Sequence, residues 1–237
     1  MPRAVVLLSG GMDSATALYE ARSRGETLYA LSFDYGQRHR RELRAARALA
    51  RAAGAREHRV VRIDLAAFGN SALTNRRIRV PRRRTLRSIG RGIPATYVPA
   101  RNTILLAFAL AYAETVGAAR IYIGANALDY SGYPDCRPEF YRAFQRVARL
   151  GTKRGVEGKP LRIVAPLLRL SKAGIVRRGT RIGVPFHLTW SCYLGGKRPC
   201  GECDACRLRA RGFREAGIRD PAVRSDRGRP RRVTSRA

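Results

Sequence analysis

The sequence has no apolar run long enough to cross a bilayer. A transmembrane helix needs about 20 consecutive apolar residues, and no stretch of the 237 residues approaches that length. The apolar run at residues 4–8 is also too short for the hydrophobic part of a secretory signal, and a glycine turn follows it. We therefore expect a cytoplasmic protein that does not associate with membranes.

Acidic residues and lysine are both scarce. The chain has 17 Asp and Glu against 48 Lys and Arg, which gives a formal net charge of +31, and only four of the basic residues are lysine. Positive charge of this size favours contact with nucleic-acid phosphates. Genome base composition can enrich arginine equally well, and the arginines are scattered along the chain rather than gathered on one element. We expect at most non-specific contact with RNA.

Two common phosphate-binding motifs are missing. There is no G-x-x-x-x-G-K-[ST], which excludes Walker-type chemistry, and no G-x-G-x-x-G, so a dinucleotide-binding fold is not indicated. The string SGGMDS, residues 9–14, stands instead between an apolar run and a helical pattern. Amide groups of Gly10 and Gly11 can turn inward there, and a helix N-terminus adds its dipole. Taken alone, the string fits an anion site and a tight turn equally well.

Short apolar runs alternate with helical patterns through most of the chain. This order predicts a parallel sheet of five strands with crossover helices. Residues 66–101 and 127–138 interrupt the rhythm as loops, and the segment from Arg219 onward has little to bury, so we expect a basic, disordered tail. The expected strands are 4–8, 27–35, 57–65, 120–126 and 162–168, and the expected helices are 13–23, 40–54, 102–117, 139–151 and 171–183.

Four of the five cysteines lie close together near the C-terminal end. Cys192, Cys200, Cys203 and Cys206 have the spacing C-x7-C-x2-C-x2-C. Four thiolates suit a closed, structural Zn²⁺ site, one per chain. A redox C-x-x-C pair and an iron–sulfur cluster are the alternatives, although redox chemistry needs only two cysteines. Cys136 stands apart, in a polar segment beyond the fourth expected strand.

Several segments together resemble one family. SGGMDS after the first strand resembles the pyrophosphate loop of the N-type ATP pyrophosphatases, the PP-loop superfamily. The chain as a whole is most similar to the 7-cyano-7-deazaguanine synthase family within it. The region 71–91 and the tail after Pro221 carry no resemblance. The matching segments are SGGMDSAT, FDYGQRHRREL, GIPATYVPARN, GANALDYSGYPDCRPEF, PLLRLSKAGIV and TWSCYLGGKRPCGECDACRLRARGF.

The resemblance implies a fold, an organisation and a reaction. The fold is Rossmann-like, of the adenine nucleotide alpha hydrolase type, with a PP-loop ATP-binding α/β domain at 1–186. A helical segment at 187–218, which binds zinc through the four cysteines, and the tail at 219–237 follow it. The reaction is the ATP-dependent conversion of 7-carboxy-7-deazaguanine and ammonia to the nitrile, preQ0, through adenylated carboxylate and amide intermediates. Family likeness also suggests a homodimer.

The resemblance, together with the chemistry that the implied reaction needs, suggests roles for individual residues. Asp13, Ser14, Arg101 and Lys172 are the candidate catalytic residues, and Asp13 either holds the Mg²⁺ of ATP or only faces the helix dipole. The residues expected to bind ATP are Leu8, Ser9, Gly10, Gly11, Met12, Asp13, Ser14, Ala15, Thr16, Ala17 and Leu18. The residues expected to bind the deazaguanine are Phe33, Tyr130, Tyr133, Asp135 and Arg137, with Asp129 as an alternative to Asp135 and Arg101 as an alternative to Arg137.

Two other functions fit parts of the sequence. A tRNA-modifying thiolase on the same fold would account for the positive charge, and it would bind tRNA tightly and use a catalytic cysteine. A zinc-ribbon nucleic-acid binder with a vestigial loop would release no pyrophosphate at all.

Overall fold

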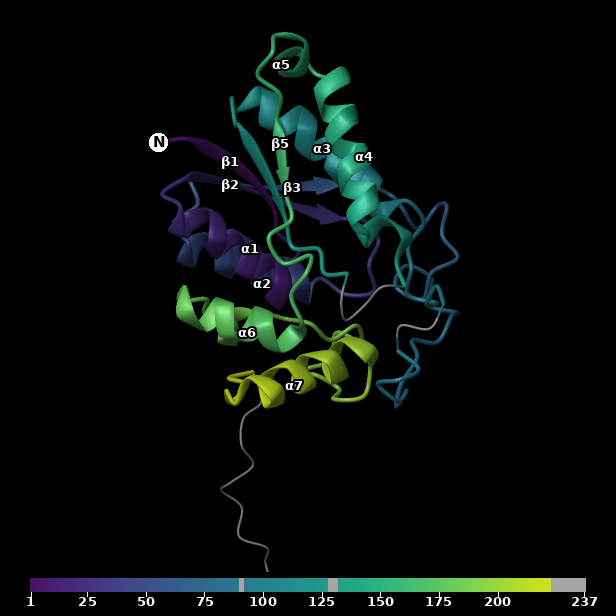
Figure 1. Cartoon of the computed structure of the whole chain (residues 1–237). Helices are drawn as coiled ribbons and strands as arrows, with labels where there is room; N and C mark the ends of the chain where they lie inside the picture. Colours follow the sequence, from purple (N-terminus) through teal and green to yellow (C-terminus); the bar gives the residue numbers. More distant parts are fainter. Residues whose placement is uncertain (90–91, 128–131, 223–237) are drawn as a thin grey trace, which may run out of the picture.

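The computed structural model describes residues 1–89, 92–127 and 132–222, and its core is one parallel sheet. The strands are β1 (Arg3–Leu7), β2 (Thr27–Asp34), β3 (Glu57–Arg62), β4 (Arg120–Ile123) and β5 (Arg162–Val164). Their order in space is β3-β2-β1-β4-β5, so β1 is central (Figure 1). Chain order reverses beside β1, because β2 lies on one side of it and β4 on the other. Such a switch point is where parallel sheets bind ligands.

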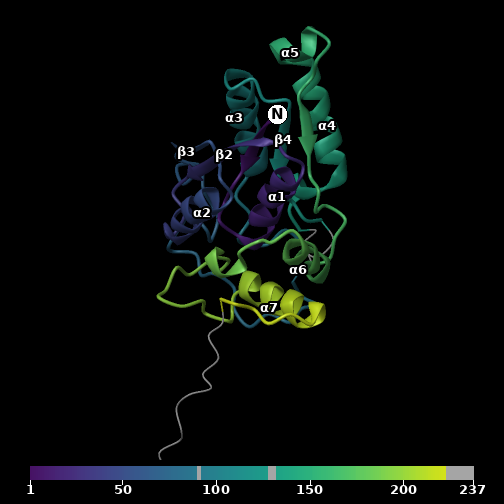
Figure 2. The ribbon, with the colours of Figure 1, turned by 90° about the vertical axis from the view of Figure 1, so that its left-hand side faces the viewer.

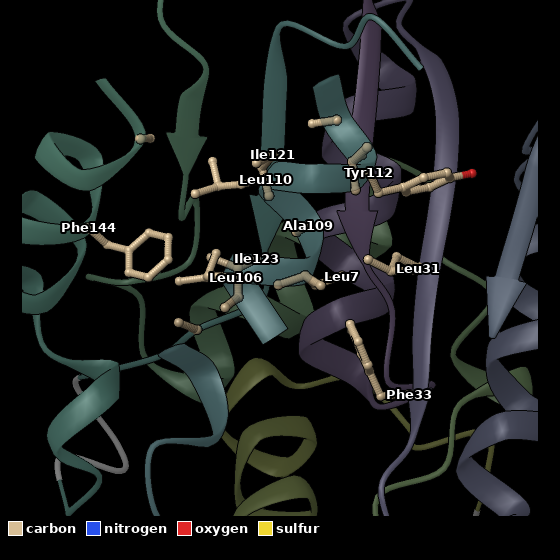
Figure 3. Close-up of a cluster of buried hydrophobic side chains, with 14 of the residues drawn as sticks. Leu7, Leu31, Phe33, Leu106, Ala109, Leu110, Tyr112, Ile121, Ile123 and Phe144 are labelled. Carbon is tan, nitrogen blue, oxygen red and sulfur yellow. The ribbon is translucent and has the colours of Figure 1, made fainter. Parts of the chain in front are cut away.

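Successive residues of β1 support two separate cores. Val5 and Leu7 face the cluster that α3 (Arg101–Thr115) and α4 (Pro138–Leu150) complete, and Figure 3 shows Leu7 close to Leu106 of α3. Ala4 and Val6 face the opposite cluster, which includes α1 (Met12–Ser23), α2 (Arg41–Ala52) and α6 (Lys172–Arg181). Period-two alternation places helices on both faces, which explains why a strand this short is almost entirely buried.

The C-terminal helix packs on this scaffold. Helix α7 (Asp204–Ala216) lies beside α6 below the sheet, as Figures 1 and 2 both show. The rings of Phe213 and Phe186 pack edge to face, with 5.2 Å between their centres, and both belong to the same core as α1. The remaining short elements are η1 (Pro134–Cys136), α5 (Lys153–Val156) and η2 (Phe186–Leu188). None of the helices in the described ranges has the length and apolar character that crossing a membrane requires.

The predicted five-stranded parallel sheet with flanking helices is confirmed, whereas several element boundaries differ. Strands β3, β4 and β5 end earlier than expected, at Arg62, Ile123 and Val164. The predicted cap at Ser171 is present, and its hydroxyl accepts the Gly174 amide at 3.1 Å. The predicted N-cap at Asn102 or Thr103 is wrong. Helix α3 begins at Arg101 after a left-handed Ala100, and the Asp135 carboxylate accepts the Asn102 amide at 2.9 Å.

The arginine-rich loop between β3 and α3 is tied to the cysteine segment. Arg38 donates to the carbonyl oxygens of Ala72 and Asn75, at 2.5 and 2.9 Å. Arg84 pairs at 3.1 Å with Asp204, whose side chain is 1% exposed. Burial raises the pKa of Asp204, and the charge of Arg84 opposes that rise. Arg84 of this loop therefore compensates a buried acidic charge at the start of α7, a contact that no local sequence pattern indicates.

Candidate functional site

A cleft of about 290 Å³ opens at the carboxyl edge of the sheet, beside the switch point. SGGMDS forms one wall, between β1 and α1, and its Ser9, Asp13 and Ser14 line the cleft. Gly124, just after β4, packs so tightly on α1 that a Cβ there would lie 2.7 Å from the Ser14 amide nitrogen. The ends of the two central strands are therefore fixed against the first turn of one helix, which is a setting for binding an anion.

Tertiary contacts hold the loop in place. Gly10 has φ of +89°, and a Cβ there would lie 2.2 Å from the carbonyl oxygen of Glu42. Its own carbonyl accepts the Trp190 amide at 2.9 Å. The Ser9 hydroxyl donates to that of Ser14 at 3.0 Å, and the Ser14 hydroxyl donates to the Gly11 carbonyl at 3.0 Å. Helix α1 has no side-chain N-cap, so its first amides are left for a ligand.

Replacement of Gly10 by alanine is expected to destabilise the protein by roughly 3 kcal/mol or more, because a left-handed conformation and a backbone clash add together. Gly25→Ala is the matched control: Gly25 has φ of +69°, but no atom lies within 4 Å of the position that a Cβ would take. The Gly25→Ala variant should lose only about 1 kcal/mol in free energy of unfolding. Urea unfolding measures both. Equal losses for the two variants would contradict the packing argument.

Asp13 and Lys172 bring α1 and α6 together at the cleft. The Lys172 ammonium lies 2.5 Å from Oδ2 of Asp13, and the two side chains are 26% exposed for Asp13 and 9% for Lys172. The second carboxylate oxygen of Asp13, Oδ1, is buried and has no hydrogen-bond partner within the described residues. A buried, unsatisfied carboxylate oxygen beside an anion loop suits a bound cation such as Mg²⁺.

Arg101 and three aromatic or sulfur-bearing side chains form the opposite wall. The guanidinium donates to the Tyr35 hydroxyl at 3.4 Å and lies 5.9 Å from the centre of the Tyr133 ring. Burial alone would lower the pKa of Arg101, but Tyr35, Tyr133, Cys136 and Asp135 oppose it and the net pKa is raised. Burial also raises the pKa of Cys136 to about 11. The wall therefore presents a permanent cation and a protonated thiol.

Only some of the residues expected to bind the substrate line the cleft. Phe33 and Tyr133 line the cleft. Asp135 is buried and caps α3, and the Arg137 guanidinium donates at 3.2 Å to the carbonyl of Pro134; neither lines the cleft. Tyr130 and Asp129 lie outside the described residues, as do residues 223–237 of the expected tail.

Ten of the eleven expected ATP-binding residues divide into two groups, and the eleventh, Gly10, is buried against α2 and does not line the cleft. The ones that line the cleft are Leu8, Ser9, Gly11, Met12, Asp13 and Ser14. The ones that pack inside are Ala15, Thr16, Ala17 and Leu18, all 0% exposed. Thr16 donates to the Met12 carbonyl at 2.8 Å. Consecutive residues of a helix point in different directions around its axis, so burial of all four shows that α1 is covered on every side here and that these residues serve packing.

Several cleft residues were not identified from the sequence: Tyr35, Gln37, Glu42, Asn126, Trp190, Ser191, Tyr193 and Arg209. They come from segments far apart in the chain, and no local pattern marks them as neighbours. Glu42, in the first turn of α2, has the most unusual environment. Its pKa is raised to about 7, chiefly by burial; the charge of Arg101 opposes this rise and Cys192 adds to it.

The four clustered cysteines meet in space. Their sulfur atoms all lie within 4.8 Å of one another, and all are free thiols. Amide groups of Leu194 and Cys200 point at the Cys192 sulfur from 3.4 Å, and the Cys203 amide points at the Cys200 sulfur from 3.3 Å. Amide donors around converging sulfurs stabilise thiolates, so this group can hold a metal ion. Cys136 is not part of it.

Comparisons with known proteins agree on a family. The family described as "Queuosine biosynthesis protein QueC" matches residues 3–217. A relative from Anaeromyxobacter sp. (strain Fw109-5), named 7-cyano-7-deazaguanine synthase, is 64% identical over 93% of this chain and 95% of its own length. A relative of the same name from Trichormus variabilis is 57% identical over 92% of this chain and 96% of its own length.

Two solved structures share the fold. NMN synthetase from Francisella tularensis superposes with a TM-score of 0.50 at 18% identity, covering 92% of this chain and 78% of its own. A 4-thiouridine synthetase, solved with RNA and bound ATP, gives a TM-score of 0.52 at 19% identity, covering 91% of this chain and 50% of its own. Similarity at this level shows the architecture alone. The family match and the relatives go further, and on that evidence the chain belongs to the QueC family of queuosine biosynthesis proteins.

Proposed function

We propose that this protein is an ATP-dependent carbon–nitrogen ligase that converts 7-carboxy-7-deazaguanine and ammonia to 7-cyano-7-deazaguanine. The observation that carries the proposal is one cleft that combines the SGGMDS loop and the Asp13–Lys172 pair with a wall of aromatic rings and a buried arginine. Relatives that match nearly the whole chain bear the name of this synthase.

The reaction needs two activations of oxygen. A carboxylate oxygen of the substrate attacks the α-phosphate of ATP, pyrophosphate leaves, and ammonia then displaces AMP to form the amide. The amide oxygen attacks the α-phosphate of a second ATP and pyrophosphate leaves again. The nitrogen then gives up both of its protons as the C–O bond breaks, and AMP leaves with that electron pair, which yields the nitrile. Two ATP molecules are thus consumed for each nitrile formed.

The residues of the cleft suit these steps. Amides and hydroxyls of the SGGMDS loop surround the leaving pyrophosphate, and preorganised donors of this kind stabilise developing charge. Lys172 adds a cation on the same side. Asp13 would hold Mg²⁺ through its unpartnered oxygen, and that ion supplies positive charge to the phosphates. Phe33 and Tyr133, which line the cleft, would contact the flat base, and Arg101 would pair with its carboxylate.

The four clustered cysteines have a structural role in this proposal. Four thiols that converge without forming disulfides suit Zn²⁺ in a closed, structural site. We propose an ATP-binding domain at 1–186, with the zinc-binding segment at 187–218 packed against it and a basic tail at 219–237. A cytoplasmic location, a homodimer and weak contact with RNA remain proposals from the family resemblance and from the net charge of +31.

Product analysis tests the function directly. Purified metal-loaded protein is incubated with ATP, Mg²⁺, ammonium and 7-carboxy-7-deazaguanine, and the amide and nitrile are followed by mass spectrometry. We expect both, with two AMP formed for each nitrile. Folded protein that yields neither product would contradict the proposal. Omission of the deazaguanine controls for uncoupled ATP hydrolysis. Pyrophosphate release that depended on tRNA instead would favour the thiolase.

A further inference from the structure

Glu42 is fixed at the cleft by its own backbone. It lies in the first turn of α2, and its carbonyl oxygen packs against Gly10 of the SGGMDS loop. Glu42 lines the same cleft as Asp13, Arg101 and Lys172. Movement of its backbone relative to the loop would break this packing, so the point from which the carboxylate projects is fixed beside the SGGMDS loop.

The Glu42 carboxylate is not paired with any side chain in residues 1–89, 92–127 and 132–222. Among the described residues it accepts no hydrogen bond and forms no ion pair, although the chain has 48 basic residues against 17 acidic ones. Every other acidic side chain in the described ranges has such a partner. An unpaired carboxylate in a cleft of so basic a protein is available to a cationic ligand.

Two other groups in the cleft could act as bases, but neither is available to accept a proton. Asp13 is paired with Lys172, and Cys136 holds its proton because burial raises its pKa to about 11. The groups that act electrostatically on Glu42 are Arg101, which attracts its charge, and Cys192, which repels it. Glu42 is thus the acidic group in this part of the cleft that remains open to a reactant.

The reaction of the proposed function, on which this inference rests, requires such a group. Ammonia attacks through its lone pair, but at neutral pH it is present mainly as ammonium, which has none. A carboxylate attracts ammonium by charge and can accept one of its protons. We propose that the Glu42 carboxylate binds ammonium in the cleft and removes the proton that ammonium must lose before its nitrogen attacks the adenylated substrate.

One N–H bond of ammonium breaks and the proton passes to a Glu42 oxygen, which leaves neutral ammonia. The ammonia lone pair then forms the C–N bond at the carboxyl carbon of the acyl-adenylate, and the bond from that carbon to the phosphate-linked oxygen breaks. AMP leaves with the electron pair. The attacking nitrogen loses a second proton to solvent, and Glu42 later returns its own.

Glu42→Gln tests the inference, because it keeps the shape and removes the base. We expect kcat/KM for ammonium to fall roughly 10²- to 10³-fold, in the range usual for loss of a general base. Adenylation precedes this step, so KM for ATP and ammonia-free pyrophosphate release in a single turnover should stay unchanged. Hydroxylamine is neutral at pH 7.5 and already carries its lone pair. Its conversion to the hydroxamate should therefore proceed at the wild-type rate.

Two further variants keep the test decisive. Glu139→Gln alters an exposed glutamate of α4, 65% exposed, and should have wild-type kinetics throughout. Glu42→Asp retains a carboxylate and should recover part of the ammonium activity. Unchanged ammonium kinetics in Glu42→Gln, an equal loss with hydroxylamine, or a raised KM for ATP would each overturn the inference. Wild-type protein that released no pyrophosphate with the deazaguanine would instead overturn the proposed function, and this inference with it.

Discussion

Asp13→Asn is expected to slow substrate-dependent pyrophosphate release roughly 10³-fold, the size of effect that follows when several kcal/mol of cation stabilisation are lost. The asparagine retains an oxygen for Lys172 but cannot supply the second carboxylate oxygen. In the wild type that oxygen, Oδ1, is buried and unpartnered among the described residues. The defect should appear in kcat, and raising Mg²⁺ should restore part of it. Pyrophosphate release over a Mg²⁺ series measures both quantities.

The matched control is Asp64→Asn, an exposed aspartate after β3 that accepts the Ala67 amide at 3.1 Å. It should have wild-type kinetics. Because Asp13→Asn also alters a buried ion pair, thermal unfolding of both variants must accompany the assay. A folded Asp13→Asn protein with near-normal turnover would exclude Asp13 from holding the metal.

Cys203→Ser is expected to abolish stoichiometric metal binding and to destabilise the protein by more than about 4 kcal/mol, a loss typical of removing a structural metal. Cys203 is 0% exposed and belongs to a small core with Ala72 and Val80 of the arginine-rich loop. Elemental analysis gives the metal content, and thermal unfolding gives the stability. Resistance of residues 72–89 to proteolysis should fall with them, because that loop rests on the cysteine segment.

Cys136→Ser separates the two cysteine environments. Cys136 is buried like Cys203, but it accepts from Asn102 at 3.3 Å and is not one of the four converging thiols. The variant should keep one metal ion per chain. Unchanged metal content in Cys203→Ser, or a loss in Cys136→Ser, would contradict the four-thiolate site. Full product formation by Cys136→Ser would also argue against a catalytic role for this cysteine.

The cysteine group supports one wall of the cleft through helix α7. Leu208 of α7 packs with Tyr133 and Cys136, which form part of the cleft wall, and with Ile89 of the loop. Loss of the metal would loosen α7 at its first turn, where Cys203 and Cys206 lie. Cys203→Ser should therefore also weaken binding of the deazaguanine, although none of the four cysteines belongs to the proposed substrate contacts.

Local sequence patterns were sufficient to predict the sheet, the position of the SGGMDS loop and the cysteine group. Continuous apolar runs separated by helical spacing admit few arrangements other than a parallel sheet, and SGGMDS has to lie at the carboxyl end of the first strand. The roles expected of Asp13 and Lys172 remain predictions, although their contact at 2.5 Å is consistent with them. Asp135 shows that the type of a residue alone does not determine its role. A carboxylate that suits a guanine edge equally suits a helix N-terminus, and here it caps α3.

The sequence by itself determined the fold class, the anion loop and the cysteine group, because each depends on residues close together in the chain. Only the tertiary structure decided which distant side chains share the cleft. Lys172 reaches Asp13 across 159 positions, Trp190 fixes Gly10 through its amide, and Glu42 enters through the packing of α2 on the loop. Such contacts arise when strands with alternating faces bring helices from different parts of the chain to one edge of the sheet, and no local periodicity encodes them.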